Sequence, residues 1–433
     1  MSNTLERLRA AFPPEGLFAD KEWILSPEPF TISEELHEQL EKLGYRLNLF
    51  NRACNELYQR SIAGKQPRWI ADYLDRGKPP ELMELSRQKQ FRQETPRVIR
   101  PDLVLTEEGF TIAEIDSVPG GIGLTGWLNQ TYSGFGFEVI GGASGMIDGF
   151  RSILGDNAEI LVSREAATYR PEMEWLARMN GGKLRVSAAE DFADGKVESG
   201  TAIYRFFELF DLPNIPGIDA LFERAVRGEV QITPPVKPYL EEKMWFALFW
   251  LRPLREFWRR ELSERHFLEL QKHIPYTWLL DPQPLPQHAV IPGLEINAWS
   301  ELASLGQKHR ELILKISGFH ETAWGSRSVV LGSDMPQTDW QAAVDHALRE
   351  FEHHPHILQR FHKGRLFDHP YFDLADGSVK TMRGRVRLCP YYFIIDGKAE
   401  LRGALATICP PDKKLLHGMK DAILAPTRSV PAV

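Results

Sequence analysis

Cysteine is scarce in this sequence, and its thiols show no pairing pattern. The three cysteines, Cys54, Cys389 and Cys409, have no Cys-x-x-Cys spacing, and the last two lie in apolar surroundings. This usage predicts buried free thiols in a protein of a reducing compartment.

Long apolar runs and an excess of positive charge are also missing. The longest apolar stretch, residues 244–251, is far too short to span a bilayer. The first residues, MSNTLERLRAAF, lack the apolar core of a signal peptide. The net charge of −7 argues against bulk binding of nucleic acid or anionic membrane, although it leaves room for a local basic pocket. We therefore expect a cytoplasmic protein with no nucleic-acid or membrane partner. The oligomeric state stays open.

The chain does contain enough apolar sequence for several cores. The length of 433 residues predicts two or three domains or one large composite fold, and the hydrophobic share of 43% is that of a globular protein with sizeable cores. Residues 1–95 have helical spacing, and a hairpin region follows. Strands at 158–163, 183–188 and 201–207 then alternate with helices at 170–182 and 218–229, which predicts a small parallel sheet. Strands dominate again from about residue 310, and the end of the chain reads as a loose tail.

The hairpin region carries an unusual set of charges. In RPDLVLTEEGFTIAEIDSVPGG, residues 100–121, the apolar runs Leu103–Leu105 and Phe110–Ile115 flank a turn signal. Period-two alternation places Glu114 and Asp116 on one face, and Asp102 on the partner strand can reach that face.

Three carboxylates crowded together would be driven toward protonation unless a cation lies among them. A hard divalent cation such as Mg²⁺ is the usual solution, because Mg²⁺ takes oxygen ligands. The alternative is a solvated hairpin edge with ordinary salt bridges to Arg97 and Arg100.

Two lysines are candidates for phosphate binding. Lys315 ends an apolar strand and precedes a loop with Gly318, Gly325 and Ser326, an arrangement that can offer a point charge and free backbone N–H groups. Lys243 lies in a predicted helix whose apolar side includes Leu240 and Met244. Each lysine could equally be exposed to solvent, and the order of residues is not that of a Walker A loop.

Arginines at period two, Arg383, Arg385 and Arg387, predict a basic strand face suited to an anionic ligand. A charged edge strand would look the same. Other patterns carry less weight. Pro355 interrupts the histidines of EHHPH at 352–356, the glycines of 119–126 lack the context of a dinucleotide site, and no nucleophile motif is present.

Together these pieces resemble the ATP-grasp superfamily, whose metal motif reads Arg-x-Asp, a hairpin turn, and Glu-x-Asn followed by Pro-Gly. The corresponding stretches here are Arg100-Pro101-Asp102, Glu114-Ile115-Asp116 and Pro119-Gly120. Asp116 replaces the usual Asn, from which we expect an altered metal affinity. The lysines follow the hairpin in sequence, whereas they precede it in ordinary members. This order is similar to that of the circularly permuted, glutathionylspermidine synthase-like group, over most of residues 96–425.

The resemblance implies a fold class and a domain plan. The fold would be α/β (α+β), ATP-grasp-like and circularly permuted. The plan is a mainly helical N-terminal region (1–95), a metal-binding hairpin part of the core (96–150), a small pre-ATP-grasp-like βαβ domain (151–235), a nucleotide-binding part (236–425) and a tail (426–433).

The resemblance also implies ATP and Mg²⁺ as cofactors and gives each residue a role. Lys243 and Lys315 would hold ATP phosphates, the Gly325-Ser326 loop would close over them, and Gln359 would lie beside the adenine. Arg100 would stabilise the oxyanion when an acyl-phosphate is attacked. The Mg²⁺ ligands would be Asp102, Glu114 and Asp116.

The function that follows is an ATP- and Mg²⁺-dependent ligase that joins a carboxylate to an amine or thiol through an acyl-phosphate. Its substrates would be small-molecule or peptide-like. Two alternatives stay open. The chain could bind nucleotide without catalysing a reaction, as the Asp116 replacement suggests. It could also be a non-enzymatic protein that holds an anion on the basic strand at 383–387.

Overall fold

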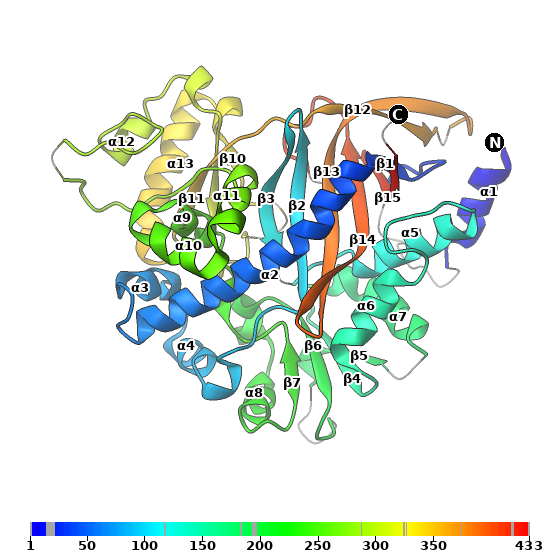
Figure 1. Cartoon of the computed structure of the whole chain (residues 1–433), viewed down its shortest axis with the longest axis horizontal. Helices are drawn as coiled ribbons and strands as arrows, with labels where there is room; N and C mark the ends of the chain where they lie inside the picture. Colours follow the sequence, from blue (N-terminus) through cyan, green and yellow to red (C-terminus); the bar gives the residue numbers. More distant parts are fainter. Residues whose placement is uncertain are drawn as a thin grey trace. The chain divides into compact units, whose positions relative to one another are not determined.

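The computed structural model describes residues 2–13, 22–116, 118–181, 184–192, 197–286, 288–323, 325, 327–373, 375–416 and 420–431. Its contacts divide the chain into two compact units, each built from separate segments (Figure 1). The first unit contains Met1–Asn51, Lys89–Val236 and Lys363–Val433, and the second contains Arg52–Gln88 and Lys237–His362. The five-part domain plan expected from the sequence stays a prediction. No helix within the described ranges is long and apolar enough to cross a membrane.

The first unit holds most of the strands. Its strands are β1 (Phe30–Ser33), β2 (Val98–Thr106), β3 (Gly109–Asp116), β4 (Ala158–Val162), β5 (Leu184–Ala188), β6 (Ala202–Phe206), β7 (Gln231–Thr233), β12 (Leu366–Phe372), β13 (Val379–Ile395), β14 (Lys398–Cys409) and β15 (Ile423–Val430). Its helices are α1 (Ser2–Ala11), α5 (Ile122–Gly134), α6 (Gly145–Leu154), α7 (Arg170–Met179) and α8 (Ile218–Val226), together with the first part of α2 (Glu34–Ile62).

A seven-stranded sheet forms the centre of this unit, in the order β1-β15-β14-β13-β2-β3 with β12 also paired to β13. Helices α5 and α6 cover one face of it, α6 at β13 and β14 and α5 at β14 and β15 (Figure 1). On that face Tyr391 and Phe393 join a buried apolar cluster with residues of both helices. Helix α2 packs against Tyr392, whose hydroxyl donates to the carbonyl of Leu40 at 2.6 Å.

A four-stranded parallel sheet, in the order β5-β4-β6-β7, is the second layer of the first unit. Every residue of β4 and β6 is buried, which explains why the strands read as continuous apolar runs rather than alternating ones. Helix α7 contacts both β5 and α5. The parallel sheet and its alternating helices, predicted from the sequence, are confirmed.

The second unit surrounds a four-stranded sheet in the order β10-β9-β11-β8. Its strands are β8 (Thr277–Leu279), β9 (Leu312–Ile316), β10 (Val330–Leu331) and β11 (His356–Arg360), and its helices are α3 (Trp69–Asp75), α4 (Pro80–Ser86), α9 (Met244–Trp250), α10 (Arg255–Leu262), α11 (Glu264–His273), α12 (Trp299–Leu302) and α13 (Gln337–Arg349). Leu312 and Leu314 of β9 pack with Trp340 and Val344 of α13. Strand alternation therefore points Ile313 and Lys315 to the opposite face.

Two predictions about local structure are wrong, and one alternative is excluded. Residues 425–433, expected to be a loose tail, lie largely in β15, which pairs with β14 on one side and with β1 on the other. The predicted helix through Leu240 and Lys243 instead begins at Met244, and Leu240 belongs to the short 3-10 helix Pro238–Glu241. Strand β13 is not an edge strand, because β2, β12 and β14 all pair with it.

Candidate functional site

The hairpin of β2 and β3 brings four charged side chains to one face of the large sheet. Arg100 lies opposite Asp116, and Asp102 lies opposite Glu114. Directly opposed residues of an antiparallel pair share a face, as do residues two apart on one strand. The hairpin and the common face of its carboxylates, both predicted from the sequence, are confirmed.

Arg100 is the centre of this group, and each of its three nitrogens donates a hydrogen bond. The acceptors are Asp102 Oδ1 at 3.1 Å, Asp116 Oδ2 at 2.9 Å and the carbonyl of Gly120 at 3.0 Å. Burial opposes the charged guanidinium, but Asp102 and Asp116 outweigh it and hold the pKa of Arg100 well above its ordinary value. Arg97 does not take the role that the alternative gave it at the carboxylates, since it donates to the carbonyl of Ile153.

A second arginine, Arg387 of β13, reaches the same carboxylate. Its Nη1 donates to Asp102 Oδ2 at 3.1 Å, and the Cys389 thiol donates to Oδ1 at 3.4 Å. Asp102 therefore lies between two guanidinium groups. Burial is the main cause that raises the pKa of the Cys389 thiol to about 12, so this cysteine stays protonated at neutral pH. All three cysteines are free and buried, as predicted.

Sequence reasoning recognised a basic strand but not which arginine faces the carboxylates. Arg383 is exposed. Arg385 is buried and donates to the backbone carbonyls of Gly364 and Pro411. Only the register of β13 against β2, which pairs Arg387 with Val104, shows that Arg387 lies next to Asp102.

Asp116 differs from Asp102 in its surroundings. Its Oδ2 accepts from Arg100, and its Oδ1 accepts from the backbone N–H of Val118 at 3.0 Å. Burial is the largest influence on this carboxyl, and the charge of Glu114 adds to it. Together they raise the pKa of Asp116 despite the opposing effect of Arg100.

The contacts of the carboxylates bear on the expected Mg²⁺ site. Both oxygens of Asp102 and of Asp116 already accept hydrogen bonds. Among the residues that the structure describes, no group of three or more His, Cys, Asp or Glu side chains is placed to hold a metal ion. As arranged, the carboxylates are neutralised by arginines rather than set out as a metal site. Their role as Mg²⁺ ligands stays a prediction.

The charged group lies next to the carboxyl end of the parallel sheet. Gly120, whose carbonyl accepts from Arg100, also accepts from the Tyr391 hydroxyl at 2.8 Å. Tyr169, in the segment that follows β4, packs so closely on Gly120 that a Cβ there would lie 2.4 Å from its ring. In open parallel sheets ligands bind outside the carboxyl ends of the strands, so this position is one where a substrate is expected.

Two buried polar atoms next to this group have no hydrogen-bond partner within the described part of the chain. They are Nε of Arg387 and Oγ1 of Thr407. The two residues are register partners on β13 and β14, so their side chains share a face. Buried donors are normally satisfied, so these two atoms are candidates to bind an acceptor from outside the chain.

The candidate nucleotide residues lie in the second unit. Lys315 of β9 is buried, and its ammonium donates to Gln359 Oε1 at 3.1 Å. Gln359 donates in turn to Thr277 Oγ1 at 3.3 Å. This polar row crosses three strands of the sheet on the face opposite to α13, so Lys315 and Gln359 are neighbours, which the sequence spacing alone did not show.

Lys243 lies immediately before α9. Its backbone N–H donates to the carbonyl of Ser317 at 2.8 Å, and its ammonium donates to the carbonyl of Ala323 at 2.8 Å. Ser317, which contacts Lys243, lies only two residues after Lys315 in the chain. Gly325 has a φ of 66°, which favours glycine, and the predicted Ser326 lies outside the described residues. The roles of these residues toward a nucleotide stay predictions.

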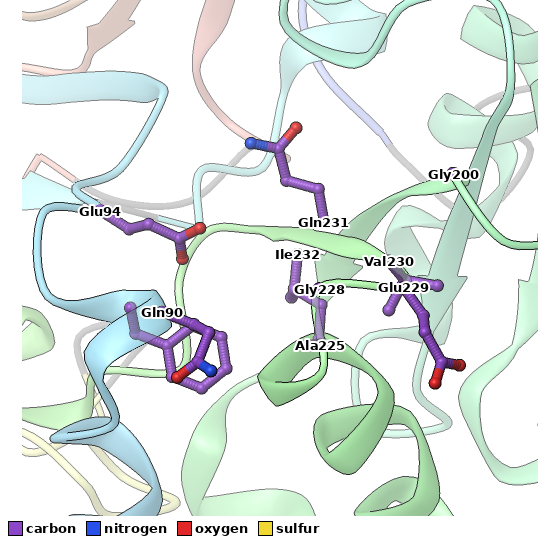
Figure 2. A pocket seen from close by; sticks show the side chains of 10 residues that line it. Gln90, Glu94, Gly200, Ala225, Gly228, Glu229, Val230, Gln231 and Ile232 are labelled. Carbon is purple, nitrogen blue, oxygen red and sulfur yellow. The ribbon is translucent and has the colours of Figure 1, made fainter.

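A pocket of about 350 Å³ lies elsewhere in the first unit (Figure 2). Phe91, Val230 and Ile232 supply apolar surface, and Gln90, Glu94 and Gln231 supply polar groups. Gln231 is the first residue of β7, so the pocket lies at the amino end of the parallel sheet. Ligands of such sheets bind at the opposite end, and no predicted site residue lines this pocket.

Comparisons with known proteins bear on the fold. No family model matches the sequence, and no curated protein is similar to it in sequence. Among solved structures, a glutathione synthetase-like effector from Globodera pallida, in its apo form, matches with a TM-score of 0.52 and 10% identity, over 94% of this chain and 90% of that one. The two chains share a fold.

The predicted fold class, α/β of the ATP-grasp-like type, is confirmed. A protein provisionally named as a gamma-glutamylcysteine synthetase, from Methylobacillus flagellatus, has 13% identity over 82% of this chain and 84% of that one, but its TM-score of 0.37 carries no argument. The circular permutation stays a prediction.

Proposed function

We propose that this chain is an ATP-dependent ligase that joins a carboxylate to an amine or thiol through an acyl-phosphate. Small-molecule or peptide-like acids and amines would be its substrates. The proposal rests on the sequence motifs, the shared fold and the charged group of the hairpin.

The observation that carries the proposal is the pair of arginines around Asp102. Arg100 and Arg387 lie on one sheet face, and Nε of Arg387 and Oγ1 of Thr407 are buried without a partner within the described ranges. A carboxylate or phosphate oxygen would satisfy both donors. Arginine is suited to such ligands because its planar guanidinium matches the geometry of their oxygens.

The reaction would need little acid–base chemistry from the protein. An oxygen of the substrate carboxylate attacks the γ-phosphorus of ATP, ADP leaves, and an acyl-phosphate forms. The amine nitrogen then attacks the acyl carbon, inorganic phosphate leaves, and the nitrogen loses a proton to solvent. Charge develops on oxygens in both steps, so fixed cations and alignment of the reactants would supply most of the acceleration. Arg100 would stabilise the oxyanion of the second step.

The second unit would hold the nucleotide. Lys315 and Lys243 would supply positive charge to the ATP phosphates, the loop with Gly325 would follow them, and Gln359 would contact the adenine. Mg²⁺ would travel with the phosphates and screen their charge. No step assigned here to the protein depends on a metal held by Asp102, Glu114 and Asp116.

A second function is favoured by one observation. Arg100 binds Asp116 where the family motif has a metal ligand, which would suit a chain that binds nucleotide without catalysis. The two functions are distinguished by measuring MgATP binding and then ADP release with candidate acids, using hydroxylamine as a general amine that traps acyl-phosphates as hydroxamates. A ligase releases ADP only with an acid present, and a degenerate relative binds MgATP without releasing ADP.

A further inference from the structure

A buried carboxylate links three separate segments of the second unit beside the candidate nucleotide residues. Glu242 has a side chain only 2% exposed, and its Oε1 accepts from the Lys78 ammonium at 2.5 Å. Its other oxygen, Oε2, accepts from the hydroxyl of Ser317. Because burying an unpaired charge is very unfavourable, these contacts fix the positions of all three side chains.

Ser317 connects this carboxylate to the start of α9. Its hydroxyl accepts from the backbone N–H of Met244 at 2.9 Å, and its carbonyl accepts from the N–H of Lys243 at 2.8 Å. Gly318 follows, where a Cβ would lie only 2.9 Å from the carboxyl carbon of Glu242. Any larger residue would displace the Glu242 carboxylate, and the end of β9 and the start of α9 lie against each other.

Lys78 brings the N-terminal part of the chain into this network. It lies between α3 and α4, in the segment Arg52–Gln88 that belongs to the second unit. Its ammonium also lies 5.7 Å from the centre of the Phe319 ring. The segment that matches nothing in the family resemblance therefore supplies a buried cation next to the junction of β9 and α9.

We propose that Ser317 and Glu242, anchored by Lys78, are positioning residues that set the ammonium of Lys243 for contact with the nucleotide phosphates. The inference rests on the proposed function, since it assigns a purpose to residues around that site. Ser317 fixes the backbone at Lys243 and Met244, because it accepts a hydrogen bond from the N–H of each. Loss of the Ser317 hydroxyl would release one of these hydrogen bonds and leave Glu242 Oε2 without its donor.

The test compares two buried serines of the same unit. Ser317→Ala removes the network hydroxyl. Ser61→Ala is the matched control, because Ser61 is also fully buried, accepts from a helix N–H (Ala71, 3.0 Å) and donates to a carbonyl (Pro67, 2.7 Å). Affinity for MgATP is measured by calorimetry on the full chain, and hydrogen exchange is followed at the Met244 amide.

We expect Ser317→Ala to weaken MgATP binding roughly tenfold and to speed exchange at Met244, whereas Ser61→Ala stays within about twofold of the wild type in affinity. Glu242→Gln is the second variant should Ser317→Ala not fold, and we expect it to weaken binding in the same direction. Wild-type affinity for MgATP in folded Ser317→Ala or folded Glu242→Gln would overturn this inference. Equal losses of affinity in Ser317→Ala and Ser61→Ala would do the same, and both results would leave the proposed function standing. Failure of the wild-type chain to bind MgATP would instead contradict the proposed function, and this role with it.

Discussion

Arg100 has three hydrogen-bond partners in the fold, two of them carboxylates, and a proposed role beyond them. Its planar guanidinium donates to Asp102 and Asp116 at once, and a lysine at this position would keep the charge but lose the planar fork. We expect Arg100→Lys to keep MgATP binding and to lower kcat by roughly 10²–10³, the scale seen when one oxyanion donor is removed. Arg97→Lys is the control, because Arg97 donates to a backbone carbonyl instead. An unchanged kcat in a folded Arg100→Lys variant would remove Arg100 from the mechanism.

The raised pKa of Asp116 leads to a prediction about how stability depends on pH. Because its pKa is raised in the fold, mainly by burial, the folded chain holds this proton more tightly than the unfolded chain. The free energy of unfolding must then fall as pH rises from the ordinary Asp pKa of 3.8 toward the raised value. Asp116→Asn, which restores the residue of the family motif, should abolish this contribution.

The measurement is urea unfolding across that pH window. We expect the free energy of unfolding of Asp116→Asn to fall less steeply with pH than that of the wild type, while the exposed-carboxylate control Asp368→Asn follows the wild type. Identical slopes for Asp116→Asn and the wild type would show that Asp116 titrates normally.

At the residue scale, the sequence predicted which side chains share a sheet face, because strand periodicity controls that. The common face of Asp102, Glu114 and Asp116 follows from alternation along two adjacent strands, and it is confirmed. The contact of Arg387 with Asp102 joins residues 285 positions apart, and nothing local determines it. The sequence could therefore indicate Arg100 as a partner of the carboxylates, but not Arg387.

At the element scale, strand β15 shows where local reading fails. Residues APTRSVPAV look like a tail because two prolines and few large apolar residues give no strand pattern. The strand forms because β14 on one side and β1 on the other complete its hydrogen bonds, and β1 comes from the opposite end of the chain. The hairpin and the parallel sheet were predictable because their partners are close in sequence.

A truncation tests the importance of β15. Ending the chain after residue 425 removes the residues that pair with β1, from Thr427 to Val430. We expect a loss of roughly 2–4 kcal/mol in the free energy of unfolding, from several backbone hydrogen bonds and buried side chains. Ending the chain after residue 430 is the control and should leave stability unchanged. Equal stability of both truncations would show that these residues are a tail after all.

At the scale of the whole molecule, each unit is assembled from segments far apart in sequence. The segment Arg52–Gln88 joins residues Lys237–His362, and the first unit gathers three further segments. Pattern reading cannot predict such assembly, because it depends on long-range contacts rather than on local periodicity. The fold class was still predictable, since the order of strands, helices and motifs resembles a known type, and the shared fold of the Globodera pallida effector supports it.

The central claim is that the second unit binds ATP through Lys315 and Lys243, and calorimetric titration of the full chain with MgATP tests it most directly. Lys315→Met keeps the apolar stem but removes the ammonium, and Lys308→Met is the control at an exposed lysine of the same unit. We predict saturable binding by the wild type and by Lys308→Met, and an affinity at least about tenfold weaker for folded Lys315→Met, equivalent to ~1.4 kcal/mol or more. No binding by the wild-type chain, or the same affinity in all three proteins, would contradict the account.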